Sequence, residues 1–338
     1  MKRALPVIVF LALALITLTA AAAPHPPITP ENVTQLVRQS ETGTPSLRRV
    51  VFSPDGSLFA TAAGNDNDYG IKIWQRDDLS LKKEITNLTG IVWDIAFSPD
   101  GRFLVSAADD TNGRTLRVWN PADGAQVAVP IALPSSSSLA FSPDGSHLAV
   151  GGLTGWPNGT IWIYDTKTWD VEQQWKAANQ NVTALVYTSD GRRLVSAGTD
   201  GLIRVWSVAD GKEEKVFSAG KQANRLALSP DGQRLASSFC AAFDASGCTK
   251  GGVAVWNTQD WKKLQKFDDL AECLAFSPDG LLLVTGSGQH DPVMRFRRVQ
   301  DWTLVHTLAG DTRSAALSPD GRLLVSLEWN KVLVWAVP

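Results

Sequence analysis

The chain has 338 residues, of which 44% are hydrophobic and 20% are charged, and its formal net charge is −2 at pH 7. This composition is that of an ordinary globular protein, and it excludes an intrinsically disordered chain. Because the basic residues are scattered and form no stripe, we expect no nucleic-acid partner.

The first residues differ from the rest of the chain. Lys2 and Arg3 precede an apolar run, residues 4–23, which ends in small residues and is followed by prolines. This order is typical of a secretory signal peptide. We therefore predict a signal peptide over residues 1–22, a Pro-rich leader over residues 23–32, and a secreted or periplasmic protein. The alternative is membrane anchoring by residues 4–23, since about twenty apolar residues can span a bilayer.

Seven nearly identical turns follow, and the clearest copy is Phe97-Ser98-Pro99-Asp100-Gly101. Proline sets φ for a type I turn, Ser or Asp can bond to the local backbone, and Gly closes the turn. Hydrophobic runs flank each copy, so each predicts a β-hairpin. The copies lie 41 to 48 residues apart, a period typical of propeller blades. Their closing glycines are Gly56, Gly101, Gly145, Gly191, Gly232, Gly280 and Gly321.

Two more strands are expected after each hairpin. The third alternates in polarity and ends near an aromatic residue, as in Leu116-Arg117-Val118-Trp119, except that the sixth repeat has Arg297 there. The fourth is more polar, which protects an exposed sheet edge. Fourth strands are predicted at residues 81–85, 127–131, 171–175, 214–217, 263–267 and 303–308. The seventh repeat lacks one, and we predict that residues 33–39 supply it and close the ring.

The hairpins, the third strands and the period together resemble the WD-repeat propeller family over residues 33–338. The resemblance implies an all-β fold: a seven-bladed β-propeller of four-stranded antiparallel blades around a central channel. The sequence departs from the family pattern, because no repeat has the histidine that often precedes the first strand in the family. We expect an exported, bacterial-type member and a monomer, with a membrane association only if residues 4–23 are retained as an anchor.

In the family, partners dock on the face that carries the loops before the first strand and between the second and third strands. The resemblance therefore implies a non-catalytic scaffold that binds protein partners of unknown identity on this face and at the channel mouth. Carried over position by position, the partner-binding candidates are Arg48, Ile91, Trp93, Thr183, Asn224, Glu272, His290, Asp311 and Arg313. Trp93 and Arg48 are favoured, since Trp and Arg dominate interface hot spots. Trp93 could instead simply cover the channel mouth.

No catalytic motif is present in the sequence, and we expect no catalytic residue, metal or cofactor. The alternative is a propeller enzyme, a hydrolase or lyase with its site at the central channel. Arg48, Glu272 and Arg313 could bind an anion there, but they do not form an acid–base pair. His290 lies beside Asp291 in a loop, a pairing that is more often structural than catalytic.

Three smaller expectations concern cysteines, sequons and tryptophans. In an oxidising compartment Cys240 and Cys248 would form a local disulfide, and Cys273 is expected to be a buried apolar residue. Four Asn-x-Ser/Thr sequons would carry glycans only in a eukaryotic secretory route: Asn32, Asn87, Asn158 and Asn181. Trp169, Trp261 and Trp302 precede fourth strands, and each is expected to pack on its own hairpin rather than form a binding rim.

Overall fold

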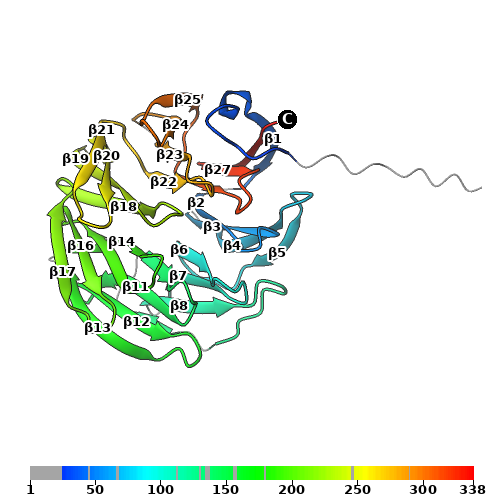
Figure 1. Ribbon diagram of the computed structural model, residues 1–338. Helices are drawn as coiled ribbons and strands as arrows, with labels where there is room; N and C mark the ends of the chain where they lie inside the picture. The colour runs from blue at the N-terminus through cyan, green and yellow to red at the C-terminus, as the bar shows by residue number, and fades with distance from the viewer. Residues whose placement is uncertain are drawn as a thin grey trace, which may run out of the picture.

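Seven four-stranded antiparallel sheets are arranged in a ring around a central channel (Figure 1). The structure is a computed structural model, and it describes residues 25–44, 46–65, 68–111, 113–128, 131–133, 138–154, 158–178, 180–244, 247–288 and 290–338. The first strands of neighbouring blades contact each other all the way round, so they line the channel. The predicted all-β seven-bladed propeller is confirmed.

Blades 1 to 4 follow the chain in order. Blade 1 contains β2 (Leu47–Phe52), β3 (Leu58–Asn65), β4 (Asp68–Gln75) and β5 (Leu81–Ile85). Blade 2 contains β6 (Val92–Phe97), β7 (Leu104–Asp110), β8 (Gly113–Trp119) and β9 (Ile131–Leu133). Blade 3 contains β10 (Ser138–Phe141), β11 (His147–Leu153), β12 (Gly159–Asp165) and β13 (Val171–Ala178). Blade 4 contains β14 (Val182–Tyr187), β15 (Arg193–Gly198), β16 (Leu202–Ser207) and β17 (Glu213–Ser218).

Blades 5 to 7 complete the ring. Blade 5 contains β18 (Gln222–Leu228), β19 (Arg234–Asp244), β20 (Gly247–Asn257) and β21 (Lys263–Phe267). Blade 6 contains β22 (Cys273–Phe276), β23 (Leu282–Gly286), β24 (Val293–Arg298) and β25 (Leu304–Ala309). Blade 7 contains β26 (Ser314–Leu317), β27 (Leu324–Glu328), β28 (Lys331–Ala336) and, from the other end of the chain, β1 (Val37–Gly43).

The predicted ring closure is therefore confirmed, but the strand begins later than expected. Residues 33–35 form a 3₁₀ turn, η1 (Val33–Gln35), and only β1 pairs with β28, with Ser40 opposite Val334. The backbone carbonyls of Asn32 and Val33 accept the N–H groups of Gln35 and Leu36, which closes this turn, while the Asn32 side chain accepts the Thr29 N–H at 2.7 Å and fixes the segment before it. Val33 is consequently turned into the core, where it is fully buried.

The segment before η1 also lies against the ring. Ile28 is buried, and its N–H donates to the Gly321 carbonyl at 2.8 Å, while the His25 ring contacts the Val337 carbonyl at 2.9 Å. Residues 25–32 of the predicted leader thus pack on blades 6 and 7. The predicted signal peptide and anchor, residues 1–23, lie outside the described residues. Within the described ranges, no helix is long and apolar enough to cross a membrane.

The repeated turns have the same geometry in every blade. The closing glycine has φ between 68° and 72° in all seven, a region in which a side chain would be strained. In blade 3, for example, Ser142 donates to Asp144 at 2.6 Å, and this bond lowers the pKa of Asp144 to about 2. Neighbouring turns touch: a β-carbon placed on Gly56 would lie 3.2 Å from Cδ of Pro319. The turns therefore form a second contact ring on one face.

One fourth strand is displaced from its predicted position. In blade 2 the expected strand at residues 127–131 is replaced by β9, which begins at Ile131, and by an isolated bridge between Gln126 and Trp119. Residues 129 and 130 of the prediction lie outside the described residues. Pro130 has no N–H to donate to a ladder, which the prediction overlooked. The other fourth strands match to within a few residues.

The core lies between blades. Each of seven clusters of buried side chains joins two neighbouring blades, and the cluster between blades 6 and 7 includes Ile28, Val33 and Leu36. In five blades the third-strand tryptophan donates its indole N–H to a hydroxyl on the second strand, as Trp119 does to Ser106 at 2.9 Å. This bond satisfies both groups inside the core.

Blade 6 departs from this pattern because Arg297 replaces the tryptophan. Its guanidinium turns to Asp269 at 2.6 Å and lies 4.3 Å from the ring centre of Phe267, both of which belong to the blade 5 side. As a result, the Thr285 hydroxyl on the second strand is buried without a hydrogen-bond partner among the described residues. Blade 6 thus exchanges a bond within the blade for an ion pair to its neighbour.

The orphaned hydroxyl gives a matched pair of predictions. Thr285→Val should leave the free energy of unfolding unchanged or raise it by up to about 1 kcal/mol, because an unpaired buried hydroxyl is removed. Thr61→Val should lower it by about 1–2 kcal/mol, because the Trp74 indole N–H, now 3.0 Å from the Thr61 hydroxyl, loses its acceptor. Denaturant unfolding of both variants checks this. Equal losses at the two positions would contradict the assignment.

The tryptophans before the fourth strands have contacts beyond those expected. Trp169 lies 5.5 Å, between ring centres, from Phe103 of blade 2, and Trp302 lies 6.0 Å from Phe267 of blade 5. Trp261 likewise packs on Phe217 of blade 4. Each therefore contacts an aromatic ring of the preceding blade, which the expectation did not include, and lies against the core cluster that the two blades share. Their φ values of 59° to 64° place them in the left-handed region, a conformation that this contact holds in place.

Candidate functional site

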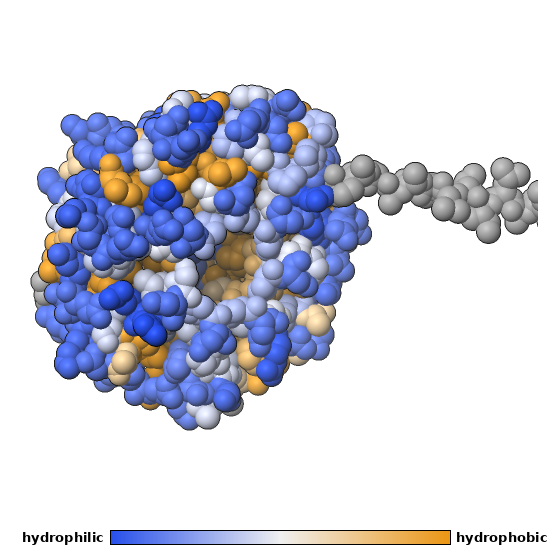
Figure 2. Space-filling model, viewed as in Figure 1, coloured by the Kyte–Doolittle hydropathy of each residue, from blue (hydrophilic) through white to orange (hydrophobic). Residues whose placement is uncertain are grey.

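A cavity of about 340 Å³ opens at the mouth of the central channel. Figure 2 shows the ring hollowed at its centre, with apolar surface inside the channel. Six of the nine partner-binding candidates line it: Arg48, Trp93, Thr183, Asn224, Glu272 and Arg313. Ser46, Leu47, Gly64, Arg225 and Trp329 complete the lining. Five strands of four blades (β2, β3, β6, β14 and β18), together with loop residues of blades 6 and 7, thus place charged and aromatic side chains around one opening.

Irregularities in the first strands direct these side chains to the channel mouth. In blades 1, 2, 4 and 5 the pairing of the first and second strands shifts by one residue, between Leu47 and Arg49 in blade 1 and at equivalent positions elsewhere. The residues left unpaired are Arg48, Trp93, Thr183 and Asn224. A β-bulge of this kind re-aims the extra side chain. All four bulged residues line the cavity.

Two tryptophans form aromatic walls, and arginines lie over them. The guanidinium carbon of Arg48 is 5.1 Å from the centre of the Trp93 ring, and that of Arg114 is 4.6 Å from it. Arg313 lies 4.0 Å from the centre of the Trp329 ring. These distances permit cation–π attraction, which fixes the planes of the rings. The Trp93 indole N–H is buried and has no hydrogen-bond partner among the described residues.

Positive charge dominates the lining, since three arginines face a single carboxylate. Glu272 accepts a hydrogen bond from the Gly288 N–H at 3.1 Å, which holds it to blade 6. Burial lowers the pKa of Arg48, and the charge of Arg313 lowers it further. Burial and the nearby charge of Arg49 lower the pKa of Arg225 to about 10. With a pKa of about 10, Arg225 remains protonated at neutral pH.

Below the cavity, hydrogen bonds link the first strands of neighbouring blades. Asp94, which is 2% exposed, pairs with Arg49 of blade 1 at 2.6 Å and accepts the Leu139 N–H of blade 3 at 2.9 Å. The remaining links are Ser138 to Leu185, Thr183 to Ala223, Arg225 to Glu272, Cys273 to Thr312 and Ser314 to Val50. We call this set the channel belt. It holds the cavity lining in place.

Two predicted residues therefore have structural contacts as well. The Thr183 hydroxyl is 2.6 Å from the Ala223 carbonyl, so its hydrogen is committed to the channel belt. Cys273 is buried, and burial raises the pKa of its thiol to about 12, as expected for an unreactive apolar residue.

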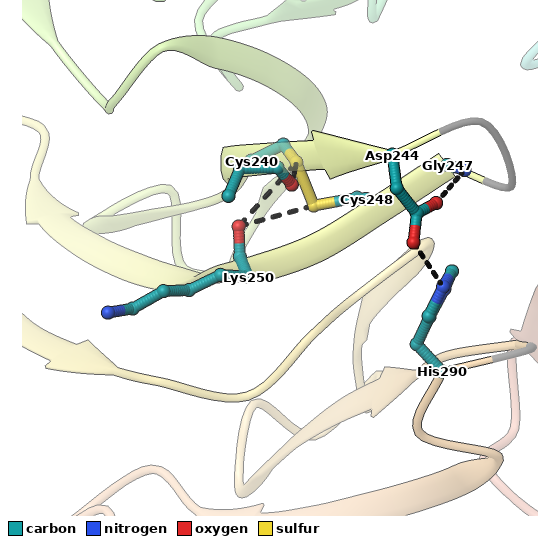
Figure 3. Close-up of a disulfide and its surroundings, with 7 residues drawn as sticks. Cys240, Asp244, Gly247, Cys248, Lys250 and His290 are labelled. Atoms are coloured by element: carbon teal, nitrogen blue, oxygen red, sulfur yellow. Dashed lines mark hydrogen bonds and ion pairs between the residues drawn. A yellow bond between two sulfur atoms is a disulfide. The ribbon is translucent and has the colours of Figure 1, made fainter.

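Three candidates do not line the cavity. Ile91 contacts Gly64, since a β-carbon on that glycine would lie 2.8 Å from Cγ2 of Ile91. Asp311 lies 3.5 Å from Arg313 on blade 7, where its Oδ1 is buried. His290 is directed towards the hairpin of blade 5, where its Nε2 is 3.6 Å from Oδ2 of Asp244 (Figure 3).

The same hairpin contains the predicted disulfide, and the structure confirms it. Cys240 and Cys248 are bonded across β19 and β20, with their Cα atoms 5.8 Å apart (Figure 3). Beyond the bond, the Asp244 side chain accepts the Gly247 N–H at 3.2 Å. The long hairpin thus reaches blade 6 at His290.

The sequence also missed residues of the cavity. Arg225 was overlooked because it follows a bulge, which brings two consecutive residues, Asn224 and Arg225, to the channel. Trp329 was overlooked because it lies in the turn between β27 and β28, outside the first strands; an exposed tryptophan in a short turn was the available signal. Among the described residues, no group of three or more His, Cys, Asp or Glu side chains is placed to hold a metal ion.

Comparison with known proteins adds a family match. The family model described as "WD domain, G-beta repeat" matches residues 36–75, 82–120, 134–165, 169–207 and 264–292. These ranges together cover more than half of the chain. They leave out most of blade 5, whose hairpin is the longest, and all of β26 to β28.

Curated relatives match shorter parts. "Telomerase protein component 1" of Rattus norvegicus is 28% identical over 46% of this chain and 6% of that protein. "p21-activated protein kinase-interacting protein 1-like" of Gallus gallus is 32% identical over 24% of this chain and 22% of that protein. "SEC12-like protein 1" of Arabidopsis thaliana is 28% identical over 45% of this chain and 38% of that protein. The chain thus spans well under half of these relatives' lengths.

Proposed function

Because the chain belongs to the WD domain, G-beta repeat family, we propose that it is a non-catalytic scaffold that binds protein partners at the face carrying the channel-mouth cavity. The observation that carries this proposal is the convergence of Arg48, Trp93 and Arg313 at one opening. Trp and Arg supply most hot-spot energy in protein interfaces. One relative is named for its interaction with p21-activated protein kinase, which fits the same type of role.

The contacts of the carboxylates favour a scaffold over a propeller hydrolase or lyase. Glu272 is engaged by the Gly288 N–H, and Asp311 lies beside Arg313. His290, the loop histidine, contacts Asp244 on blade 5. General acid–base chemistry needs a pair of groups that reach one reacting bond. These contacts give the cavity a binding character instead.

The proposal includes an extracytoplasmic, bacterial-type export of the protein. It is supported by the disulfide between Cys240 and Cys248, because such bonds persist in oxidising compartments and are rare in the cytosol. The basic start and apolar run of residues 2–23 support it from the sequence. Mass spectrometry of the protein isolated from its source would detect the amino terminus and the state of both cysteines; an intact residue 1 with free thiols would contradict export.

Affinity capture tests the scaffold. We expect Trp93→Ala and Arg48→Ala each to reduce the amount of partner retained from source extracts by about tenfold or more, the loss typical of a hot-spot residue. Thermal unfolding should change little, because neither side chain belongs to a core cluster. Quantitative mass spectrometry of the retained proteins measures the effect.

The matched control is Arg192→Ala. Arg192 is exposed and follows the turn between β14 and β15. That turn lies on the face opposite the cavity, because β14 begins at the cavity and runs away from it. Its replacement should leave capture unchanged. If the Trp93 and Arg48 variants retain partners as well as this control does, the assigned face is wrong.

A further inference from the structure

Two arginines of the cavity lack a counter-ion. Of the arginines in the described part of the chain, all but three lie within 4.0 Å of a carboxylate. The exceptions are Arg48, Arg192 and Arg225. Arg192 is exposed to water, whereas Arg48 and Arg225 are half-buried and line the same cavity. Carboxylates act on both only from a distance, Asp109 on Arg48 and Asp94 and Glu272 on Arg225, so neither guanidinium has the close ion pair that usually accompanies a partly buried charge.

Both guanidiniums are held in position by the backbone. Nε of Arg48 donates to the Gly64 carbonyl and Nε of Arg225 donates to the Glu272 carbonyl, each at 3.0 Å. No described residue accepts a hydrogen bond from their terminal nitrogens. Each arginine is therefore anchored through one nitrogen and keeps its terminal nitrogens available. This is a preorganised arrangement for an anion with two acceptor oxygens.

The remaining lining restricts the anion. Arg313 is already beside Asp311 at 3.5 Å, so it contributes less free charge than the other two. Glu272 also faces the cavity and would repel a second negative charge on the same ligand group. The rings of Trp93 and Trp329 are aromatic walls with guanidiniums over them, Arg48 and Arg114 at Trp93 and Arg313 at Trp329. A singly charged planar carboxylate on a carbon chain fits this lining better than a compact dianion.

We propose that the cavity binds a carboxylate side chain, carried by an acidic peptide segment of the partner, between Arg48 and Arg225. This rests on the proposed scaffold function and gives it a ligand class. The cavity opens at the centre of a face, so an extended segment can place one side chain in it while the rest lies across the rim.

Selection from a displayed library of random dodecapeptides tests the ligand class directly. We expect the peptides enriched on the folded full chain to share an Asp or Glu at a fixed position. Their affinity should fall as salt rises, because the contact is between opposite charges. Arg48→Met and Arg225→Met should each weaken binding of a selected peptide by about tenfold or more, and Arg192→Met should not.

A change in the peptide tests whether its negative charge, and not only its shape, is recognised. Replacing the shared acid by its amide should cause a loss as large as that from the arginine variants. Enrichment of peptides without an acid, or no enrichment at all, would overturn the proposal. Stronger displacement of the peptide by inorganic phosphate than by acetate, at equal concentration, would also overturn it, because the cavity would then prefer phosphate.

Stability and peptide affinity, measured together, exclude a merely structural role. Arg225→Met also removes the channel-belt bond to the Glu272 carbonyl, so a fall in unfolding temperature is expected, and the peptide affinity measured beside it decides whether Arg225 also binds. A lower unfolding temperature with unchanged peptide affinity would make it a structural residue and overturn the proposal. The scaffold function and the carboxylate ligand are tested separately. If partner capture depends on Trp93 but the selected peptides are neutral, the scaffold function stands and the carboxylate ligand is rejected.

Discussion

A chain that lacks residues 1–43 is expected not to fold into a stable ring at 25 °C. The deletion leaves β28 without its partner β1, and it removes Ile28, Val33 and Leu36 from the core between blades 6 and 7. Burial of three aliphatic side chains contributes about 5–9 kcal/mol. The net stability of a folded domain is only about 5–15 kcal/mol, so this loss is comparable with the whole.

The control for this deletion is the chain that lacks residues 1–24, which retains every contact just named. It should show one cooperative thermal transition by circular dichroism. Adding a synthetic peptide of residues 25–43 to the shorter chain should restore that transition, because the missing strand and η1 are then supplied in trans. Equal unfolding temperatures for the two truncated chains would show that β1 does not close the ring.

Asp94→Ala is expected to lower the free energy of unfolding by about 3–5 kcal/mol, the cost of breaking a buried ion pair by removal of one partner. Asp94 joins three blades through Arg49, its own strand and the Leu139 N–H. Without Asp94, the positive charge of Arg49 would repel that of Arg225 with no carboxylate between them. Arg49 already lowers the pKa of Arg225 in the intact protein. Denaturant unfolding gives the loss, and Asp94→Asn should lose less because it keeps an acceptor oxygen.

An exposed ion pair of the same length supplies the control. Arg193 and Glu214 are 2.5 Å apart, close to the 2.6 Å of Arg49 and Asp94, but both side chains are about 40% exposed. Glu214→Ala should therefore cost at most about 1 kcal/mol. If the two substitutions cost the same, burial does not decide the strength of these pairs and the importance given to the channel belt is wrong.

The fold could be predicted because its signal is local and repeated. The Ser-Pro-Asp-Gly turn fixes a hairpin through φ and side-chain hydrogen bonds within five residues, and repetition turned a weak signal into a specific one. The start of β1 could not be predicted in the same way. Residues 33–35 precede an apolar, strand-like pattern, but backbone hydrogen bonds from Gln35 to Asn32 and from Leu36 to Val33 fold them into η1.

The site was only partly accessible from sequence. Arg48, Trp93, Thr183 and Asn224 were found because a family position pointed to them. Arg225 was not, since the bulge after Ala223 is created by pairing with β19 and leaves no mark in the local pattern. The channel belt is equally hidden, because its partners lie on different blades. Asp94 reads as an ordinary polar residue of a strand until Arg49 and Leu139 are placed beside it.

The sharing of blade 7 between distant segments has a consequence for biosynthesis. β1 ends at Gly43 and its partner β28 begins at Lys331. At about 5–20 residues per second, a ribosome takes on the order of 15–60 seconds to make the intervening chain. Throughout that interval the nascent β1 has an unpaired edge, and the hydrophobic side chains of the 25–36 segment have no surface to cover. Its Arg38, Gln39 and Glu41 are the polar residues suited to keep such a waiting edge from joining another chain.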